Sequence, residues 1–412
     1  MNYLTFMNMY KYSLFILIIL SVSCKNRSTE TSKFSQGQID SLCLDSTKLI
    51  QIDDQAATVI DLNPFLKKKS FDFGENVKDV HFVPLETRDE SLVANIYKII
   101  VTNSMIYIMD NYKKGGVVIF DKEGKFIKRI TPGRGPGELY RLYDIAYDKQ
   151  NDKLLAYQHP FLLIYTPMGN YIRQIRLPFG FYNFLVTPEG YIFKTFDKYG
   201  NEHLGTKKDY TLLVSDKNFK LEYAGLPNPF EMSTGGYSYL YSNDGEISIT
   251  QNYNDTIYRY ISGENKLKAK YVMDYHSKQL PDRYLKATRH DLQNVLDQNN
   301  YYYFIGEYLE TTFHHAFFLR NDYLGLRTVI YRDKRTDGLM GGTNADYNVN
   351  EIPAMAFPKA TYGSYFISVN YPNPNDSLLL KSSIITYQDK QKLKGRKEDD
   401  NPMLVFYQLK EI

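Results

Sequence analysis

Residues 104–130 of the chain are SMIYIMDNYKKGGVVIFDKEGKFIKRI, and their apolar side chains alternate with polar ones along three short runs. Each run predicts a β-strand with one buried face, and the polar or glycine-rich letters between the runs predict turns. The second turn holds Gly124 at the place where a tight hairpin needs a residue that tolerates a positive φ. This segment therefore predicts antiparallel strands joined by tight turns.

The same pattern returns at a nearly constant interval. Residues 153–177, KLLAYQHPFLLIYTPMGNYIRQIRL, repeat it with Gly169 in the place of Gly124. Further hairpins begin at Val214, Tyr260 and Tyr331. Counted from Phe120, successive hairpins lie 45, 49, 46 and 71 residues apart. A repeat of about 40–50 residues built from antiparallel strands is typical of β-propeller blades, which bury their faces only against neighbouring blades.

The one long interval contains a helical pattern. Residues 281–300, PDRYLKATRHDLQNVLDQNN, place apolar side chains on one face of a helix and lack strand alternation. A helical insertion near 278–300 therefore explains the interval. Five hairpins, together with strands expected at 364–370 and 403–409, give six blades. The strand expected near 80–85 has no blade of its own, so we expect it to pair with 403–409 and close the ring.

The composition agrees with an all-β protein, and we predict a six-bladed β-propeller of four-stranded antiparallel blades. The chain has 38 Tyr and 24 Phe but no Trp, and aromatic residues suit the half-buried face of a strand. Its formal net charge is only +3, although 24% of its residues are charged. This balance gives no electrostatic reason to expect a nucleic-acid partner.

The first 23 residues predict a secretory signal. Residues 13–22, SLFILIILSV, form an apolar run that is short for a membrane span and leads into small residues. Cys24 comes directly after Ser23, which resembles the signal of a bacterial lipoprotein, where the cysteine is acylated after cleavage. We expect 1–23 to be a lipoprotein signal peptide and Cys24 to carry the lipid. The alternative is an ordinary secretory signal that happens to precede a cysteine.

Four short segments carry a resemblance to a known family. They are residues 79–87 (DVHFVPLET), 133–138 (GRGPGE), 254–258 (NDTIY) and 401–409 (NPMLVFYQL). In this order they resemble the six-bladed β-propeller lipoproteins of the Bacteroidota, which are related to NHL-repeat propellers. The resemblance spans nearly the whole expected mature chain. It implies the ring and the lipid anchor, and it implies little about chemistry because most members have no assigned activity.

Polar residues after Cys24 set the expected domain limits. Residues 24–60 have no apolar period, so we expect a flexible tether there and the propeller over 61–412. Several acyl chains on Cys24 would hold the protein stably at a membrane. Lys25 and Arg27 are basic, whereas surface-exported lipoproteins of this phylum tend to carry acidic residues here. We therefore expect the periplasmic side of the outer membrane.

The glycine-rich run at 133–137, GRGPG, provides the candidate ligand site. It matches neither a dinucleotide-binding pattern nor a P-loop, and expected strands rather than a helix flank it. We expect it to join the outer strand of one blade to the inner strand of the next, on the face where propellers commonly admit ligands. Arg134, Tyr140 and Arg141 are therefore the residues that we expect to bind a ligand.

The other polar residues give no clear metal or catalytic set. His314 and His315 are adjacent on an expected strand, so their side chains point to opposite faces and cannot share one ion. The remaining histidines show no ligand spacing, and no GxSxG nucleophile motif occurs. The alternative is a divalent metal ion in the channel of the ring, like the ion that gluconolactonase-like six-bladed propellers hold there. The carboxylates near strand ends that would hold it are Asp110, Asp144, Asp255 and Glu307.

We therefore expect a monomeric, lipid-anchored binding or scaffold protein of the cell envelope, with a glycan, peptide or protein as its ligand and with no cofactor. The alternative is a metal-dependent hydrolase or lactonase that uses the channel of the ring. Function has to be argued from a site, because one fold serves many functions. The choice between these two classes depends on which side chains line the channel.

Overall fold

The computed structural model describes residues 33–55, 57–66, 71, 73–110, 115–195, 200–228, 240–243, 245–343, 356–372, 380–394 and 396–412. The chain divides into two compact units, 1–41 and 42–412. The described part of the first unit holds α2 (Gln36–Asp40), which Ser35 caps. Cys24 and the expected signal peptide lie outside the described residues. Within the described residues, no helix is both long and apolar enough to cross a membrane.

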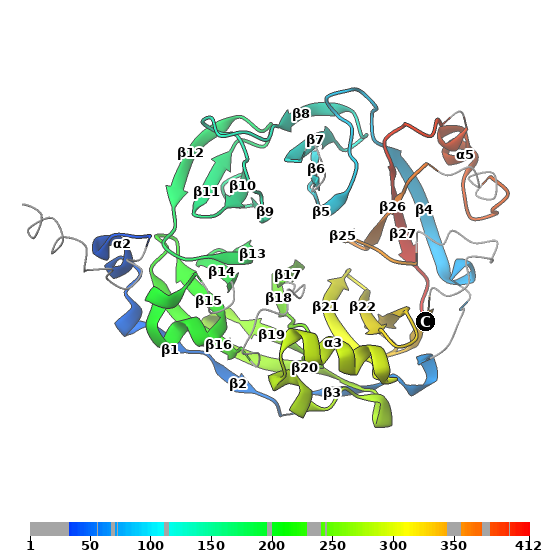
Figure 1. Cartoon of the computed structure of the whole chain (residues 1–412). Helices are drawn as coiled ribbons and strands as arrows, with labels where there is room; N and C mark the ends of the chain where they lie inside the picture. Colours follow the sequence, from blue (N-terminus) through cyan, green and yellow to red (C-terminus); the bar gives the residue numbers. More distant parts are fainter. Residues whose placement is uncertain are drawn as a thin grey trace, which may run out of the picture. The chain divides into compact units, whose positions relative to one another are not determined.

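The second unit is a ring of six four-stranded, mostly antiparallel blades, as predicted (Figure 1). Blade 1 contains β5 (Ile96–Val101), β6 (Met105–Asp110), β7 (Val117–Asp121) and β8 (Phe126–Ile130). Blade 2 contains β9 (Asp144–Asp148), β10 (Lys153–Gln158), β11 (Phe161–Tyr165) and β12 (Tyr171–Arg176). Blade 3 contains β13 (Phe181–Val186), β14 (Gly190–Thr195), β15 (Tyr210–Asp216) and β16 (Leu221–Pro227).

The remaining blades complete the circle. Blade 4 contains β17 (Leu240–Asn243), β18 (Glu246–Ile249), β19 (Thr256–Ile261) and β20 (Lys266–Asp274). Blade 5 contains β21 (Tyr303–Glu310), β22 (His314–Asn321), β23 (Leu326–Asp333) and β24 (Leu339–Thr343). Blade 6 contains β25 (Ala360–Tyr362), β26 (Tyr365–Asn370), β27 (Met403–Leu409) and β4 (Val77–Pro84). Each inner strand contacts the inner strand of the next blade, and β25 contacts β5.

Buried apolar clusters hold each pair of neighbouring blades together. Leu163 of blade 2, for example, packs in one cluster with Ile119 of blade 1, and Leu404 of blade 6 packs in another with Val118 of blade 1. The apolar face of a four-stranded sheet has to be covered by another element. In this ring the two neighbouring blades provide that cover.

The five hairpins expected from the sequence are confirmed, and each joins the third and fourth strands of a blade. In blade 1 the Asp121 carboxylate accepts hydrogen bonds from Glu123 N (3.1 Å) and Lys125 N (2.8 Å). Gly124 takes a φ of +88° in this turn, a conformation that strains residues with a side chain. Asp216 accepts the corresponding backbone hydrogen bonds in blade 3.

The predicted closure of the ring is also confirmed. β4 pairs antiparallel with β27, with Pro84 opposite Met403 and Val77 opposite Leu409. Blade 6 therefore takes its outer strand from the N-terminal side of the ring and its other three strands from the C-terminal side. This pairing joins the two ends of the ring without a covalent bond.

The described residues between 42 and 66 form a belt along the outer edge of blades 3 to 5 (Figure 1). Within it β1 (Lys48–Leu49) pairs in parallel with β16, while β2 (Gln51–Asp53) and β3 (Thr58–Asp61) pair in parallel with β20.

Three apolar side chains fix the belt to successive clusters. Leu42 packs with side chains of blades 2 and 3, Ile50 with blades 3 and 4, and Leu62 with blades 4 and 5. The expected tether over 24–60 therefore includes a segment that is bound to the ring. Its apolar residues follow no single helix or strand period, because they fill three successive gaps between blades.

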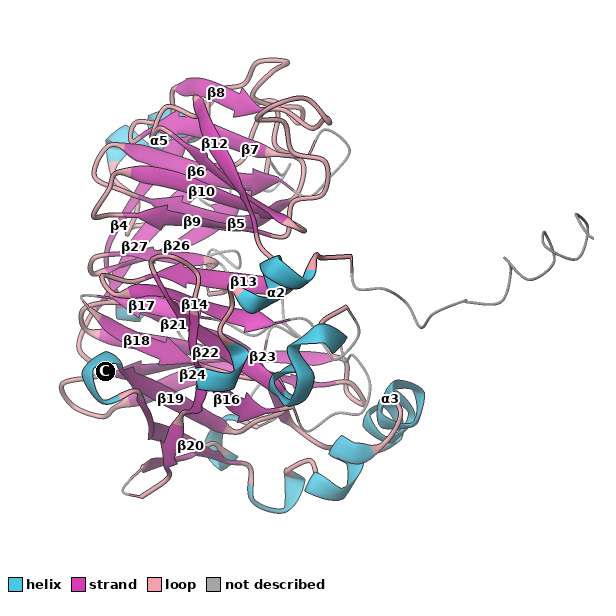
Figure 2. Cartoon of the chain, turned by 90° about the vertical axis from the view of Figure 1, so that its left-hand side faces the viewer, coloured by secondary structure: helices cyan, strands magenta, loops and turns pink. Residues whose placement is uncertain are grey.

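Helices occur in a few of the connections of the ring (Figure 2). α3 (Arg289–Gln298) lies within the helical insertion predicted near 278–300, and the Thr288 hydroxyl accepts a hydrogen bond from Asp291 N (3.2 Å) at its start. α5 (Tyr387–Leu393) lies between β26 and β27. The short 3₁₀ segments are η1 (Leu44–Ser46), η2 (Asn63–Phe65), η3 (Gly74–Asn76), η4 (Glu202–Asp209), η5 (Ser262–Glu264), η6 (His276–Lys278) and η7 (Asp282–Lys286).

Candidate functional site

A cavity of about 1890 Å³ lies at the centre of the ring, and residues from all six blades line it. The inner strands β5, β9, β13, β17, β21 and β25 contribute to its wall together with the loops that follow several of them. Ligand sites in proteins are usually concave, with a few polar groups among apolar ones. The cavity is therefore the candidate functional site.

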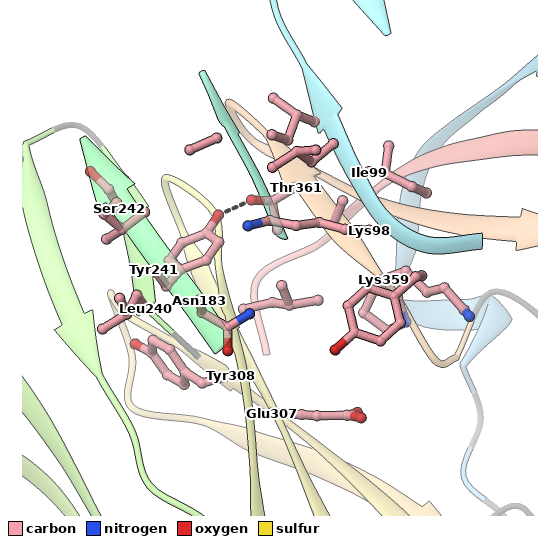
Figure 3. A pocket seen from close by; sticks show the side chains of 18 of the residues that line it. Lys98, Ile99, Asn183, Leu240, Tyr241, Ser242, Glu307, Tyr308, Lys359 and Thr361 are labelled. Carbon is pink, nitrogen blue, oxygen red and sulfur yellow. Dashed lines mark hydrogen bonds between the residues drawn. The ribbon is translucent and has the colours of Figure 1, made fainter. Parts of the chain in front are cut away.

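Uncharged polar side chains from different blades meet in this cavity (Figure 3). Asn183 extends from β13, Tyr241 from β17 and Thr361 from β25. The Tyr241 hydroxyl donates a hydrogen bond to the backbone oxygen of Glu310 (2.6 Å) and is also bonded to the Thr361 hydroxyl. One tyrosine of blade 4 thus links the walls formed by blades 5 and 6.

Lys98 brings a positive charge to the cavity wall, and a buried carboxylate balances it. The Lys98 ammonium lies 2.8 Å from Asp144 Oδ1, and the Asp144 side chain is fully buried. Phe184 N donates a hydrogen bond to the other carboxylate oxygen (3.0 Å). Burial raises the pKa of Asp144, while the ammonium group of Lys98 opposes this rise. The charge pair therefore ties the inner strands of blades 1, 2 and 3 together.

A second set of charged side chains lies where blades 5 and 6 meet. Glu307 forms an ion pair with Arg327, whose guanidinium carbon lies 4.9 Å from the centre of the Phe318 ring. Lys359 donates a hydrogen bond to the backbone oxygen of Ile96 (3.1 Å). Removal from water and the nearby Arg327 guanidinium lower the pKa of Lys359. Within this part of the wall, the carboxylate of Glu307 is already matched by a cation.

Behind the wall, a buried polar network joins blades 4 and 5. Glu310 accepts hydrogen bonds from Lys334 Nζ (2.6 Å) and from the Tyr308 hydroxyl (2.8 Å). Burial opposes ionisation of Glu310, whereas its interactions with His315, Lys270 and Lys334 favour ionisation and lower its pKa. Glu310 is therefore charged in the folded protein.

His315 stands between two tyrosines of this network. Its Nδ1 lies 2.5 Å from the Tyr308 hydroxyl and its Nε2 lies 3.0 Å from the Tyr271 hydroxyl. The Tyr308 hydroxyl donates a hydrogen bond to the Glu310 carboxylate, and the Tyr271 hydroxyl accepts one from Arg332 (2.9 Å). The network is therefore fully satisfied when a neutral His315 carries its proton on Nδ1. Burial lowers the pKa of His315 and favours this neutral form.

Comparison with known proteins gives a family and a fold. Residues 57–408 match the model of a family described as a domain of unknown function (DUF4934). The chain belongs to this family. No curated protein matches it.

Solved structures resemble this DUF4934 chain to different extents. An exported protein of Bacteroides fragilis is similar over 86% of this chain and 100% of its own, with a TM-score of 0.70 and 19% sequence identity. The extracellular domain of a hybrid two-component system of B. thetaiotaomicron is similar over 63% of this chain but only 28% of its own, with a TM-score of 0.36 and 14% identity. The first of these likenesses supports the propeller fold.

The predicted ligand residues of this DUF4934 chain lie on the connection between blades 1 and 2, outside the cavity lining. The Arg134 guanidinium stacks on the Tyr140 ring with 4.4 Å between the guanidinium carbon and the ring centre. Arg141 stacks on Tyr143 in the same way at 5.2 Å. All three predicted residues are exposed to solvent. The structure therefore pairs Arg134 with Tyr140 and places Arg141 beside Tyr143, which the prediction did not include.

The carboxylates suggested for a channel metal lie apart. Asp144 and Glu307 pair with the cations described above, and Asp110 lies 3.7 Å from Arg129. Asp255 accepts a hydrogen bond from Gln279 (2.8 Å), and burial raises its pKa to about 7. No group of three metal-ligating side chains occurs within the described residues.

The two adjacent histidines have separate surroundings, as the strand pattern predicted. His314 Nε2 lies 2.9 Å from the backbone oxygen of Lys410, whereas His315 contacts the tyrosine network. Sequence reasoning missed the cavity residues Asn183, Tyr241 and Thr361. They are ordinary polar residues on short strands, and only the ring closure brings them together.

Proposed function

We propose that this chain is a binding protein of the cell envelope that takes a glycan into the central cavity of its ring. The observation that carries the proposal is the cavity of about 1890 Å³, in which polar side chains of several blades converge. The fixed ring positions these groups before a ligand arrives, which limits the entropic cost of binding.

The chemistry of the lining favours a sugar. The charges of Lys98 and Arg327 are matched by Asp144 and Glu307, so they give little net attraction to a charged group inside the cavity. The lining also includes Lys359 and several other charged residues, but most of its remaining polar groups are amides, hydroxyls and tyrosine rings. Amides and hydroxyls form hydrogen bonds with sugar hydroxyls, and tyrosine rings combine an apolar face with a polar hydroxyl. The separate positions of the four candidate carboxylates favour binding over metal-dependent hydrolysis.

Binding can be tested by filling the cavity. Asn183→Trp places a large ring in the lining of blade 3, and Asn218→Trp makes the same change on the exposed hairpin between β15 and β16. Isothermal titration against a panel of neutral and acidic oligosaccharides gives the affinities. We expect Asn183→Trp to weaken the best ligand by at least tenfold and Asn218→Trp to leave it unchanged. Equal binding by both variants would contradict the proposal.

The proposal includes a lipid anchor on Cys24, on the periplasmic side of the outer membrane. The sequence around Cys24 and the basic Lys25 and Arg27 support it, and the likeness to an exported protein of B. fragilis adds support. Cys24→Ser should move the protein from the membrane fraction to the soluble fraction of lysed cells. Continued retention of the Cys24→Ser variant in membranes would show that the anchor is not this cysteine.

A further inference from the structure

Five aromatic and cationic side chains follow one another on the connection between blades 1 and 2 and on β13, and the last two lie on or next to the inner strands of the ring. We call them the rim strip, and they are Arg134, Tyr140, Arg141, Tyr143 and Tyr182. Besides the two arginine–tyrosine stacks described above, the Tyr143 and Tyr182 rings lie 6.5 Å apart, centre to centre. Tyr140 is 65% exposed and Tyr182 is 37% exposed. The strip therefore presents aromatic and cationic surface to solvent.

One end of the rim strip adjoins residues of the inner strands that line the cavity. Tyr182 directly precedes Asn183, which lines the cavity, and Tyr143 lies two residues before Ile145, which also lines it. A chain-like ligand that occupies the cavity and leaves it at this edge passes over the strip. The strip is therefore placed to contact a part of the ligand that the cavity does not hold.

Hydrogen bonds and a buried leucine support the loop that carries the strip. Tyr140 N donates a hydrogen bond to Gln158 Oε1 (2.6 Å), and Gly135 N donates one to Glu138 Oε2 (2.7 Å). Leu139, between them, is buried and its backbone N donates to Thr131 O (3.0 Å). Groups that are ordered before binding lose less entropy when a ligand arrives.

The two arginines of the strip differ from others in the ring. Arginines that form an ion pair with a carboxylate include Arg129, Arg259, Arg320, Arg327, Arg332 and Arg335. Among the described residues, neither Arg134 nor Arg141 has such a partner. A guanidinium group that lies over a tyrosine ring still has N–H groups that can form paired hydrogen bonds with both oxygens of a carboxylate.

We propose that the rim strip binds the carboxylate groups of an acidic oligosaccharide, one that contains uronic or sialic acid, while another part of the same molecule occupies the cavity. This inference rests on the proposed function of the cavity and names its ligand class. The guanidinium groups of Arg134 and Arg141 bind the carboxylates, and the exposed rings of Tyr140 and Tyr182 pack against the C–H face of the sugars.

The test uses oligosaccharides of galacturonic, glucuronic or sialic acid, each beside its methyl ester, in which the carboxylate charge is removed. Titration of the full mature chain gives the affinities. We expect the best acid to bind roughly tenfold more tightly than its ester, and Arg134→Gln and Arg141→Gln each to remove roughly tenfold of the affinity for the acid only. Arg173→Gln, an exposed arginine on β12, is the matched control and should change neither affinity.

The outcomes separate this inference from the proposed function. One outcome is that acid and ester bind equally and the arginine variants match the control, while Asn183→Trp weakens the binding of both ligands. The rim strip then does not bind the carboxylates, and the proposed binding of a glycan in the cavity is retained. If Asn183→Trp also leaves binding unchanged, the proposed function fails. If no acidic oligosaccharide binds, or only an oligoglutamate peptide binds in an Arg134- and Arg141-dependent way, the assignment of an acidic glycan is overturned.

Discussion

At the scale of single residues, the ring is locked by buried polar side chains. The Asn401 amide oxygen accepts a hydrogen bond from Val93 N (2.8 Å), and its nitrogen donates to the backbone oxygens of Glu86 (2.8 Å) and Ser91 (3.0 Å). Asn401 N in turn donates to the Thr87 hydroxyl (2.9 Å). Two of the sequence segments that resemble propeller lipoproteins therefore contact each other, and their shared role is ring closure.

Replacing Asn401 should loosen this closure. Asn401→Ala removes the partner of the buried backbone groups of Val93 and Ser91, so we expect a loss of about 2–3 kcal/mol in the free energy of unfolding. Urea denaturation followed by circular dichroism measures it. Asn218→Ala, on an exposed turn, should cost less than about 0.5 kcal/mol. Equal losses in the two variants would mean that the Asn401 contacts do not support the ring.

His315 should make stability depend on pH. The folded protein holds it neutral, with Glu310, Lys270, Lys334 and Arg332 around it, and burial lowers its pKa. The unfolded chain takes up this proton near pH 6.5, so stability falls by up to about 1.4 kcal/mol per pH unit as the pH drops below that value.

The contribution of His315 can be isolated by comparison. His315→Gln removes the group, so its unfolding free energy should fall less steeply than that of the wild type between pH 6.5 and pH 5. His290→Gln, on the exposed side of α3, should keep the wild-type slope. Identical slopes for all three proteins would show that His315 does not take up a proton on unfolding.

At the scale of elements, the hairpin turns were predictable because their residues are local. The turn after β7 needs Gly124 both for its φ of +88° and for space, since a Cβ would come within 2.0 Å of the Pro84 backbone oxygen. Gly124→Ala should therefore destabilise the protein by at least about 1–2 kcal/mol. Gly263→Ala, in the corresponding hairpin of blade 4, meets no atom within 4 Å and should be nearly neutral. Thermal denaturation distinguishes them, and a neutral Gly124→Ala would contradict this contact.

The belt was the element that the sequence did not predict. Its strands pair with blades that are distant in the chain, and no local period marks such contacts. Leu62 is fully buried and Leu49 is 53% exposed, although both lie in the belt. Leu62→Ala should cost about 2–5 kcal/mol in the free energy of unfolding, and Leu49→Ala should change it by less than about 0.5 kcal/mol. If Leu62→Ala proves as mild as Leu49→Ala, the belt does not stabilise the ring.

α5 gives the closing strand a further support. Phe82 N donates a hydrogen bond to Asp389 Oδ1 (3.2 Å), and Lys392 Nζ donates to Phe82 O (2.7 Å). These side chains satisfy backbone groups on the open edge of β4, which would otherwise remain available for pairing with another strand. The periodic strands of the repeat predicted the blade, but nothing local linked α5 to residue 82.

At the scale of the whole molecule, the repeat interval and the turn residues were sufficient to predict six blades and their closure. The residues of the candidate site were harder to predict from the sequence. Arg134, Tyr140 and Arg141 were predicted from an unusual glycine-rich loop and lie outside the cavity lining. Asn183, Tyr241 and Thr361, which do line the cavity, come together only through the ring. These three side chains lie on different blades, and no repeat or turn signal in the sequence marks their contacts.

The most direct test of the central claim is a crystal structure of the mature chain grown with its tightest-binding oligosaccharide. The account predicts the sugar inside the ring, within hydrogen-bonding distance of Asn183, Tyr241 or Thr361, and extending past Tyr182 towards Arg141. A sugar bound only on the outer edges of the blades, with the central cavity unoccupied, would contradict it.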